Sequence, residues 1–383
     1  MKIIKRQFLL MKTTSKFNDM PLQTISRKVW SSFIDGLLLL IVGAILTFTA
    51  GFSVLRNNET FAKYNKKFVD NKGAIKNMAS RDYLYDKNGE VESLFCKIES
   101  KLSPLYQKII STSSLSELTD LEQELLYLHF ILSDERTNAA AKDYEELVKV
   151  KLQASLKIYQ AHGQYTNIDS DTIKEKIGVQ NPCSKAIESA FKYYPLIMDL
   201  KISLLQNTSN VEFITSDYPS IKYNLWSNIR NMYSGWGLSS VGILYILPIS
   251  PKLALIAYDP VIYNIKNLKN NIGKIRNDSD INEINRLMLL NSDQNIFFSA
   301  NIPLHYIDRL ILPIKEHIKP PQTVQLLGNT ESFLIATSAR RINYKANLKF
   351  LSILPESLEW DVPLHAAGLL RPTSEEIAKD IGI

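Results

Sequence analysis

The chain has 383 residues, of which 45% are apolar and 22% are charged. This composition excludes a disordered protein and supplies enough apolar side chains for a sizeable core. The formal net charge of +6 is a mild basic excess spread along the chain. It is not the concentrated basic patch that typifies nucleic-acid-binding proteins. The two cysteines, Cys96 and Cys183, have no partner at metal-binding or redox spacing, and we expect two free thiols rather than a disulfide.

The most distinctive feature is an uncharged apolar stretch that begins at Gly36 and ends at Leu55. At about 1.5 Å of rise per residue, a helix of this length spans roughly 30 Å, the thickness of a hydrocarbon core. The stretch therefore predicts a single-pass transmembrane helix and makes the membrane a predicted partner. A cleaved signal peptide is less favoured because small residues are poorly placed for cleavage. A fully buried core helix is the remaining alternative.

The residues around this stretch define the expected organisation. A basic arm covers residues 1–35, and a polar connector follows over residues 56–79. We expect the α+β domain at residues 80–310 and a C-terminal extension at residues 311–383. Basic residues lie on both sides of the predicted helix, and the close flank favours a cytoplasmic α+β domain whereas the full arm favours the reverse. The sequence leaves the true start open among three methionines, Met1, Met11 and Met20.

Residues 80–207 are expected to form a helical block. Apolar residues after Val91 recur at steps of three and four, which is typical of an amphipathic helix, and Pro104 should kink or end it. Thr119 and Glu122 have the spacing of a capping box, so a second helix should begin there.

The pattern changes at Val211. Residues 211–224 predict a strand, a turn and a second strand, and residues 242–259 predict two short strands around a turn between Pro248 and Pro251. A further helix should follow. Helices, then a small antiparallel sheet, then more helices indicate an α+β fold behind the transmembrane helix.

The N-terminal segment ISRKVWSSFIDGLLLLIV is similar to the first helix of the RDD family of membrane proteins. In that family an arginine and an aspartate flank the first span, and the matching positions here are Arg27 and Asp35. RDD proteins carry several spans and this chain has one, so the resemblance implies no transport activity. Two ordinary flanking charges are the alternative explanation.

The central chain resembles a bacterial family known as domain of unknown function 4238, over about residues 76–300. The resemblance is carried by five segments in the family's order: YDKNGEVESLFCKIESKLSPL, which contains Glu99; ERT, which contains Arg136; FITSDYP; LPISP; and INRLMLLNSDQNIFFS, which contains Asn285. Members usually begin with a His-rich stretch and a proline, and here the apolar stretch takes that place. The family implies no established activity.

Candidate ligand-binding residues cluster at Thr215, Ser216 and Asp217, where two hydroxyls and a carboxylate end a predicted strand and could orient a ligand. The alternative is a turn in which these side chains bind their own backbone. The resemblance adds Asn285 as a ligand-binding candidate. Arg136 could bind an anion or pair with Glu99 or Asp217, although a basic residue at a helix end and an exposed salt bridge are also common structural features.

Two functions follow from these residues. The first is a membrane-anchored protein whose α+β domain binds a ligand or a protein partner. The second is a metal-assisted hydrolase acting on phosphodiesters, in which Asp217 and Glu99 hold the metal and Arg136 stabilises developing negative charge. The five histidines have no zinc-motif spacing and no nucleotide-binding loop is present, so the cofactor is unknown and the sequence leaves enzymatic activity open.

Overall fold

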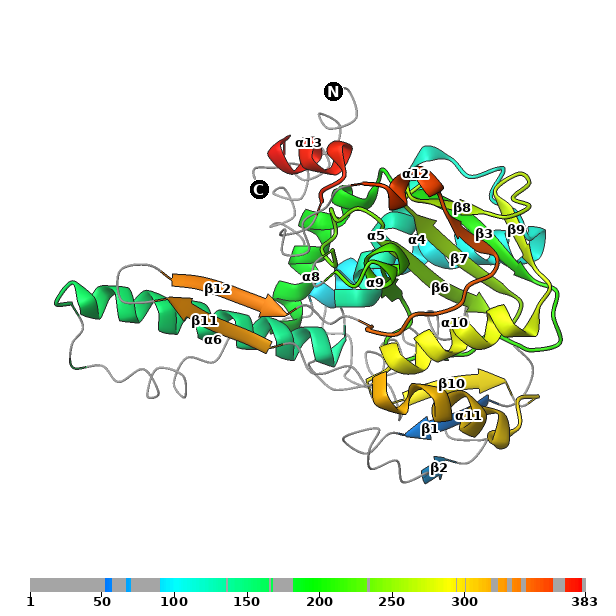
Figure 1. Ribbon diagram of the computed structural model, residues 1–383, viewed down its shortest axis with the longest axis horizontal. Coiled ribbons are helices and arrows are strands. Elements are labelled where there is room, and N and C mark those ends of the chain that lie inside the picture. Colours follow the sequence, from blue (N-terminus) through cyan, green and yellow to red (C-terminus); the bar gives the residue numbers. More distant parts are fainter. Residues whose placement is uncertain are drawn as a thin grey trace, which may run out of the picture.

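The computed structural model of the chain describes residues 52–56, 67–69, 90–135, 137–164, 167, 182–232, 235–293, 295–299, 301–317, 323–328, 333–338, 342–360 and 369–380. It confirms a mixed α+β fold (Figure 1). The basic arm, with Arg27 and Asp35 of the RDD resemblance, lies outside these ranges, as does most of the predicted transmembrane helix.

A five-stranded sheet forms the centre of the molecule. Its strands lie in the order β5 (Ile221–Tyr223), β6 (Leu244–Ser250), β7 (Leu253–Tyr258), β3 (Lys201–Asn207) and β9 (Ile272–Ile275). Strands β6 and β7 form the predicted antiparallel pair around the Pro248–Pro251 turn. The pairing of β3 with β9 is parallel, so the sheet is mixed rather than antiparallel as predicted.

Every residue of β6 and β7 is buried, because helices cover both faces of the sheet. Leu244 and Ile246 of β6 pack into one apolar core, and Tyr245 and Leu247 pack into another on the opposite face. This alternation follows from the strand geometry, in which successive side chains point to opposite faces.

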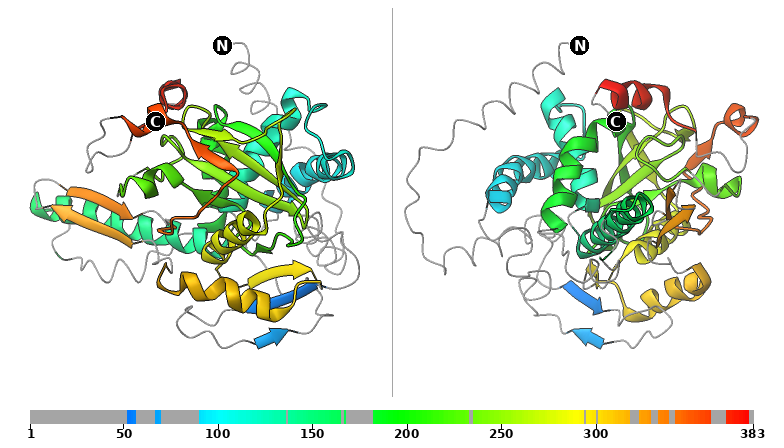
Figure 2. Two further views of the ribbon diagram at one scale, coloured as in Figure 1. Left: turned by 45° about the vertical axis from the view of Figure 1, so that its right-hand side comes forward. Right: turned by 90° about the vertical axis from the view of Figure 1, so that its left-hand side faces the viewer.

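Three helices cover the face of the sheet that carries Tyr245 and Leu247, and one helix covers the face that carries Leu244 and Ile246 (Figure 2). The three are α4 (Glu90–Thr112), α5 (Asp120–Glu135) and α8 (Pro182–Tyr193), and the single helix is α10 (Asp278–Asn291). Helix α4 continues through Pro104 instead of ending there. The predicted capping box of α5 is confirmed, since Glu122 N–H donates to Thr119 Oγ1 at 3.2 Å and Thr119 N–H donates to the Glu122 carboxylate at 2.7 Å.

The prediction that the helical block reaches residue 207 is wrong. The chain leaves α8 through a short 3-10 helix, η3 (Tyr194–Ile197), and then forms strand β3. Leu204 and Leu205 are both fully buried, on opposite faces of the sheet. A strand buried on both faces has a continuous apolar run without alternation, so its sequence resembles that of a buried helix.

A second sheet lies beneath α10 and has the order β2 (Lys67–Val69), β1 (Phe52–Arg56), β10 (Asn295–Ser299) and β4 (Thr215–Ser216) (Figure 1). Strand β1 pairs with β10, from Phe52 opposite Ser299 to Arg56 opposite Asn295. Strand β4 pairs with β10, and β5 pairs with β6. The two strands predicted within residues 211–224 are therefore present but belong to different sheets.

Strand β1 corrects the predicted transmembrane helix, because its first four residues were assigned to that helix. The uncharged stretch that remains, residues 36–51, has sixteen residues and lies outside the described ranges. A helix of that length would reach only about 24 Å, against a hydrocarbon core of roughly 30 Å. Within the described ranges, no helix has both the length and the apolar character needed to cross a membrane.

The remaining elements surround this framework. The long helix α6 (Asn138–Ala161) projects from the body, and the hairpin of β11 (Thr323–Gly328) and β12 (Phe333–Ser338) lies along it (Figure 1). Strand β13 (Leu351–Ile353) pairs with β8 (Tyr263–Ile265). The short elements are α9 (Leu225–Ile229), α11 (Leu304–Ile311), η4 (Leu312–His317), α12 (Pro355–Leu358) and α13 (Pro372–Asp380).

The C-terminal segment packs into the same core as the central sheet. Ile342, Leu348 and Phe350 are buried in the cluster that also contains α10. Farther on, buried Arg371 anchors α13, because its guanidinium binds both carboxylate oxygens of Asp199 at 2.7 and 2.9 Å. The charge pair satisfies a guanidinium that burial alone would destabilise.

Candidate functional site

The three residues proposed as a ligand-binding loop mouth are consecutive, and the side chains of Ser216 and Asp217 bind backbone groups. Ser216 Oγ accepts the N–H of Tyr218 at 3.0 Å, which is the geometry of a serine turn. Asp217 Oδ1 accepts the N–H of Asp293 at 3.0 Å and so ties this loop to the end of α10. Thr215 is buried, and its hydroxyl has no hydrogen-bond partner among the described residues. The turn alternative is therefore observed for Ser216, whereas Asp217 binds the backbone of a segment distant in sequence.

Asn285, the fourth ligand-binding candidate, is fully buried in α10. Its Oδ1 accepts the N–H of Ile214 at 3.0 Å, and its Nδ2 donates to the carbonyl of Glu212 and to the hydroxyl of Tyr306, both at 2.8 Å. The side chain thus binds two backbone groups of the segment before β4, where, within the described ranges, the backbone has no neighbouring strand to bind. These contacts describe a structural strap between α10 and β4.

The other predicted catalytic residues are Glu99, which lies in α4, and Arg136. Glu99 is buried on the same face of α4 as Tyr106, and Tyr106 contacts Nδ1 of His129 through its hydroxyl. Arg136 lies outside the described ranges, so its pairing with Glu99 or Asp217 stays a prediction. In the described part of the chain, no three His, Cys, Asp or Glu side chains are grouped to hold a metal ion.

A buried charged cluster, which the sequence did not reveal, joins the end of α5 to strand β5. Asp134 forms a salt bridge with Lys222 at 3.0 Å, and both side chains are largely buried. Burial and the neighbouring Asp134 charge raise the pKa of Glu135 to about 7. Two carboxylates at a helix C-terminus are unfavourable with the helix dipole, and Lys222 offsets them. The salt bridge of this cluster fastens α5 to the sheet, and its Glu135 carboxyl group titrates near neutral pH.

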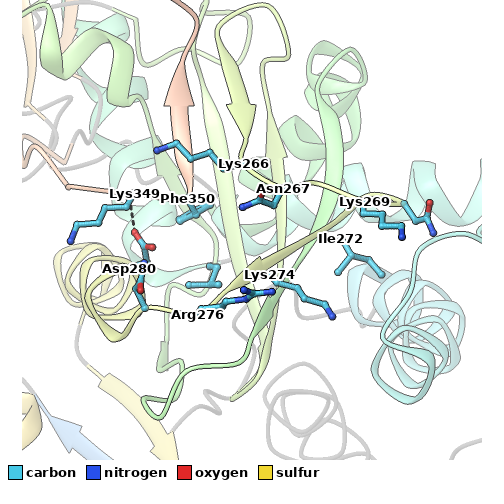
Figure 3. Close-up of a pocket in the computed structure, with 12 residues that line it drawn as sticks. Lys266, Asn267, Lys269, Ile272, Lys274, Arg276, Asp280, Lys349 and Phe350 are labelled. Carbon is cyan, nitrogen blue, oxygen red and sulfur yellow. Dashed lines mark hydrogen bonds between the residues drawn. The ribbon is translucent and has the colours of Figure 1, made fainter.

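The strongest candidate for a ligand site is a basic pocket at the β9 edge of the central sheet, with a volume of about 630 Å³. Figure 3 shows five basic side chains spread along this hollow rather than meeting at one point. They are Lys266, Lys269, Lys274, Arg276 and Lys349. We call this site the basic pocket.

Local sequence explains how the basic pocket forms. The turn between β8 and β9 contains Asn267, Asn270 and Asn271, whose φ angles are 57°, 51° and 59°. Asparagine tolerates this left-handed conformation better than most residues. The turn exposes Lys269 on one side of the pocket, and the pairing of β13 with β8 brings Lys349 to the other.

The charges in the basic pocket are nearly uncompensated. None of its five cations lies within salt-bridge distance of a carboxylate among the described residues, and all five side chains are exposed. Asp280 is the one acidic residue in the lining, and its carboxylate accepts the backbone N–H of Lys349 (Figure 3). Clustered cations in a hollow with low-dielectric walls focus a positive potential. The site is therefore suited to an anion.

Sequence reasoning missed this site because it averaged charge over the whole chain. Four of the five cations fall between Lys266 and Arg276, in the segment KNLKNNIGKIR, which contains no acidic residue. That local density was a usable signal. The sequence gives no such signal for Lys349, because it reaches the pocket only through the pairing of β13 with β8, which are distant in sequence.

A known protein family accounts for most of the chain that forms the two sheets and their helices. A family model described as "Protein of unknown function (DUF4238)" matches residues 52–301. The chain belongs to the DUF4238 family. No curated protein and no solved structure matches the chain.

The DUF4238 region begins at the first residue of β1 and ends just after β10, so it starts earlier than residue 76, where the sequence resemblance was expected to begin. It contains the whole of the five-stranded and four-stranded sheets, whereas β13, which pairs with β8, lies beyond it. Four of the pocket cations lie within the region and Lys349 lies beyond it. An RDD-like helix is not shown by the comparison.

The strap formed by Asn285 predicts a large loss of stability on truncation. We expect Asn285→Ala to lower the free energy of unfolding by about 2–4 kcal/mol, because it leaves the Ile214 N–H and the Glu212 carbonyl buried without their partner. Urea denaturation measures the change. Asn264→Ala, on an exposed strand position, should change stability by less than about 0.5 kcal/mol. Native-like stability of Asn285→Ala would refute the structural role.

The raised pKa of Glu135 predicts a pH-dependent stability. Between its ordinary value of 4.5 and about 7, the folded state keeps a proton that the unfolded state releases. The free energy of unfolding therefore falls as pH rises through this window. Relative to Glu135→Gln, which cannot titrate, the native protein should lose up to about 3 kcal/mol. Urea denaturation from pH 4.5 to 8 tests this, with exposed Glu117→Gln as the control. A constant difference between native and Glu135→Gln across the window would contradict the expectation.

Proposed function

We propose that this protein binds a multiply charged, phosphate-type anion in the basic pocket. The observation that carries the proposal is the set of five exposed cations around one hollow, none in salt-bridge distance of a carboxylate within the described ranges. Such cations repel one another, and a bound anion relieves that repulsion. Because the cations are spread along the pocket, it can accept one phosphate group or several linked ones.

The strength of binding follows from the exposure of these side chains. A charge-assisted hydrogen bond contributes about 1.5–3 kcal/mol, and less where water screens it. Three such contacts at the lower end give about 4.5 kcal/mol, and hence a dissociation constant on the order of 0.1–1 mM. This range suits reversible recognition of an abundant metabolite or of an anionic surface.

The hydrolase hypothesis gains no support from the described residues. Asp217, its proposed metal ligand, accepts a backbone N–H from the end of α10. Ligand binding is thus the function that the geometry favours, with a protein partner as the remaining sequence-based alternative.

Membrane association stays part of the proposal, on the strength of the uncharged residues 36–51. If these residues hold the protein in a bilayer, it should stay in the pellet after carbonate extraction of membranes, and Leu40→Lys/Ile45→Lys should release it. Leu9→Lys/Leu10→Lys, in the basic arm, is the matched control. Recovery of the native chain in the carbonate supernatant would contradict the anchor and leave anion binding untouched.

Charge reversal in the basic pocket tests anion binding. Lys269→Glu/Lys274→Glu should weaken the binding of tripolyphosphate at least tenfold, because two attractions become repulsions. Isothermal titration calorimetry at low salt measures the affinity, which should also fall as salt rises. Lys151→Glu/Lys157→Glu, at exposed positions of α6, changes the net charge equally and should bind as the native protein does. Equal binding by native and pocket variants would refute the proposal.

A further inference from the structure

A second hollow, which we call the apolar groove, lies next to the basic pocket. Its volume is about 270 Å³, and seven of its eight lining residues are apolar, Asn347 being the exception. Ile229 of α9 and Leu358 of α12 line it, and each remains 46% exposed. Exposed aliphatic side chains that line a shared hollow lose the stabilisation that burial would give, and an apolar ligand restores it.

The groove and the pocket share one wall. Lys349 and Phe350 line the basic pocket, whereas Leu348 and Leu351 line the apolar groove. The wall is therefore a single short stretch of chain with cationic and apolar chemistry on its two sides. A ligand that crosses this stretch meets both surfaces.

Helix α10 and strand β5 hold the shared wall in place. Asp280 accepts the Lys349 N–H, and Glu283 Oε2 accepts the N–H of Asn347 at 3.2 Å. Tyr223 Oη accepts the N–H of Ala346 at 3.0 Å. Because these three hydrogen bonds fix its backbone, the wall presents both surfaces without first having to be ordered.

We infer that the ligand is an anionic amphiphile: a phosphate headgroup that lies in the basic pocket, joined to an acyl chain that lies in the apolar groove. This inference rests on the proposed anion binding and names the ligand class. An acyl chain suits the groove better than a peptide does, because a peptide backbone needs hydrogen-bond partners. The groove lining offers one polar side chain, that of Asn347.

Short-chain lipids that stay monomeric in water provide the test. Dihexanoyl phosphatidic acid and glycerol 3-phosphate share a phosphate, and dihexanoyl phosphatidylcholine keeps the acyl chains with a zwitterionic headgroup. Titration calorimetry on the full chain should show at least tenfold tighter binding of dihexanoyl phosphatidic acid than of either other compound, since burial of each methylene group strengthens binding.

Variants then assign each half of the ligand to its hollow. Ile229→Ser/Leu358→Ser should weaken dihexanoyl phosphatidic acid binding at least fivefold and leave glycerol 3-phosphate binding unchanged. Lys266→Glu/Lys349→Glu, at the end of the basic pocket beside the shared wall, should weaken both. Leu121→Ser/Val261→Ser replaces two residues that are 55% and 59% exposed and line neither hollow, so it is the matched control for the serine pair.

The outcomes separate this inference from the proposed function. Equal affinity for dihexanoyl phosphatidic acid and glycerol 3-phosphate would overturn the amphiphile and leave anion binding standing. Lipid binding unaffected by Lys266→Glu/Lys349→Glu would overturn it as well, because the headgroup would then lie elsewhere. Failure of tripolyphosphate and of all three lipid-derived compounds to bind would overturn the proposed function itself. An acidic peptide that binds with equal affinity and displaces the lipid would overturn the amphiphile and indicate a protein partner instead.

Discussion

Strands β6 and β7 are buried along their whole length, and this burial imposes the architecture. A sheet with no exposed face must be covered twice, so the chain supplies α4, α5 and α8 on one side and α10 with the C-terminal segment on the other. Only the edges of such a sheet reach solvent. The edge strand β9 is where polar and charged side chains can gather without disturbing either core, and the basic pocket lies there.

The loops between these layers are held by buried polar side chains that replace backbone partners. Asn285 binds the segment before β4, and Asn291 Nδ2 donates to the carbonyls of Tyr218 and Ser220 at 2.7 and 2.9 Å. Arg371 does the same at the C-terminal end through Asp199 and two carbonyls. Each of these groups would be costly to bury without partners. Asn285, a ligand-binding candidate from the sequence, is one of the residues that hold these loops.

The sequence predicted what depends on local chemistry. The α+β class, the capping box at Thr119 and the β6–β7 pair around the two prolines are all present. It mistook β3 for helix, because a strand buried on both faces shows no alternation. It also assigned Phe52 and the next three residues to a membrane helix, since apolar residues of a core strand and of a membrane helix look alike. The density of basic residues between Lys266 and Arg276 could have indicated the pocket from the sequence, whereas the contribution of Lys349 could not be predicted, because it depends on the pairing of β13 with β8.

Helix α10 connects the fold to the site. Its apolar side packs Ile284 and Met288 against the sheet, while Asp280 and Glu283 near its N-terminus bind the backbone N–H groups of the shared wall. Both carboxylates are thus committed to positioning, and Glu283 also accepts the hydroxyl of Tyr344 at 2.8 Å. A carboxylate that binds backbone amides is fixed in place, and from that place Asp280 interacts electrostatically with Lys349 and Lys266. The contacts that order the wall therefore also fix where the one acidic side chain of the pocket lining lies, so that the structure of this face and the charge distribution of the basic pocket have one origin.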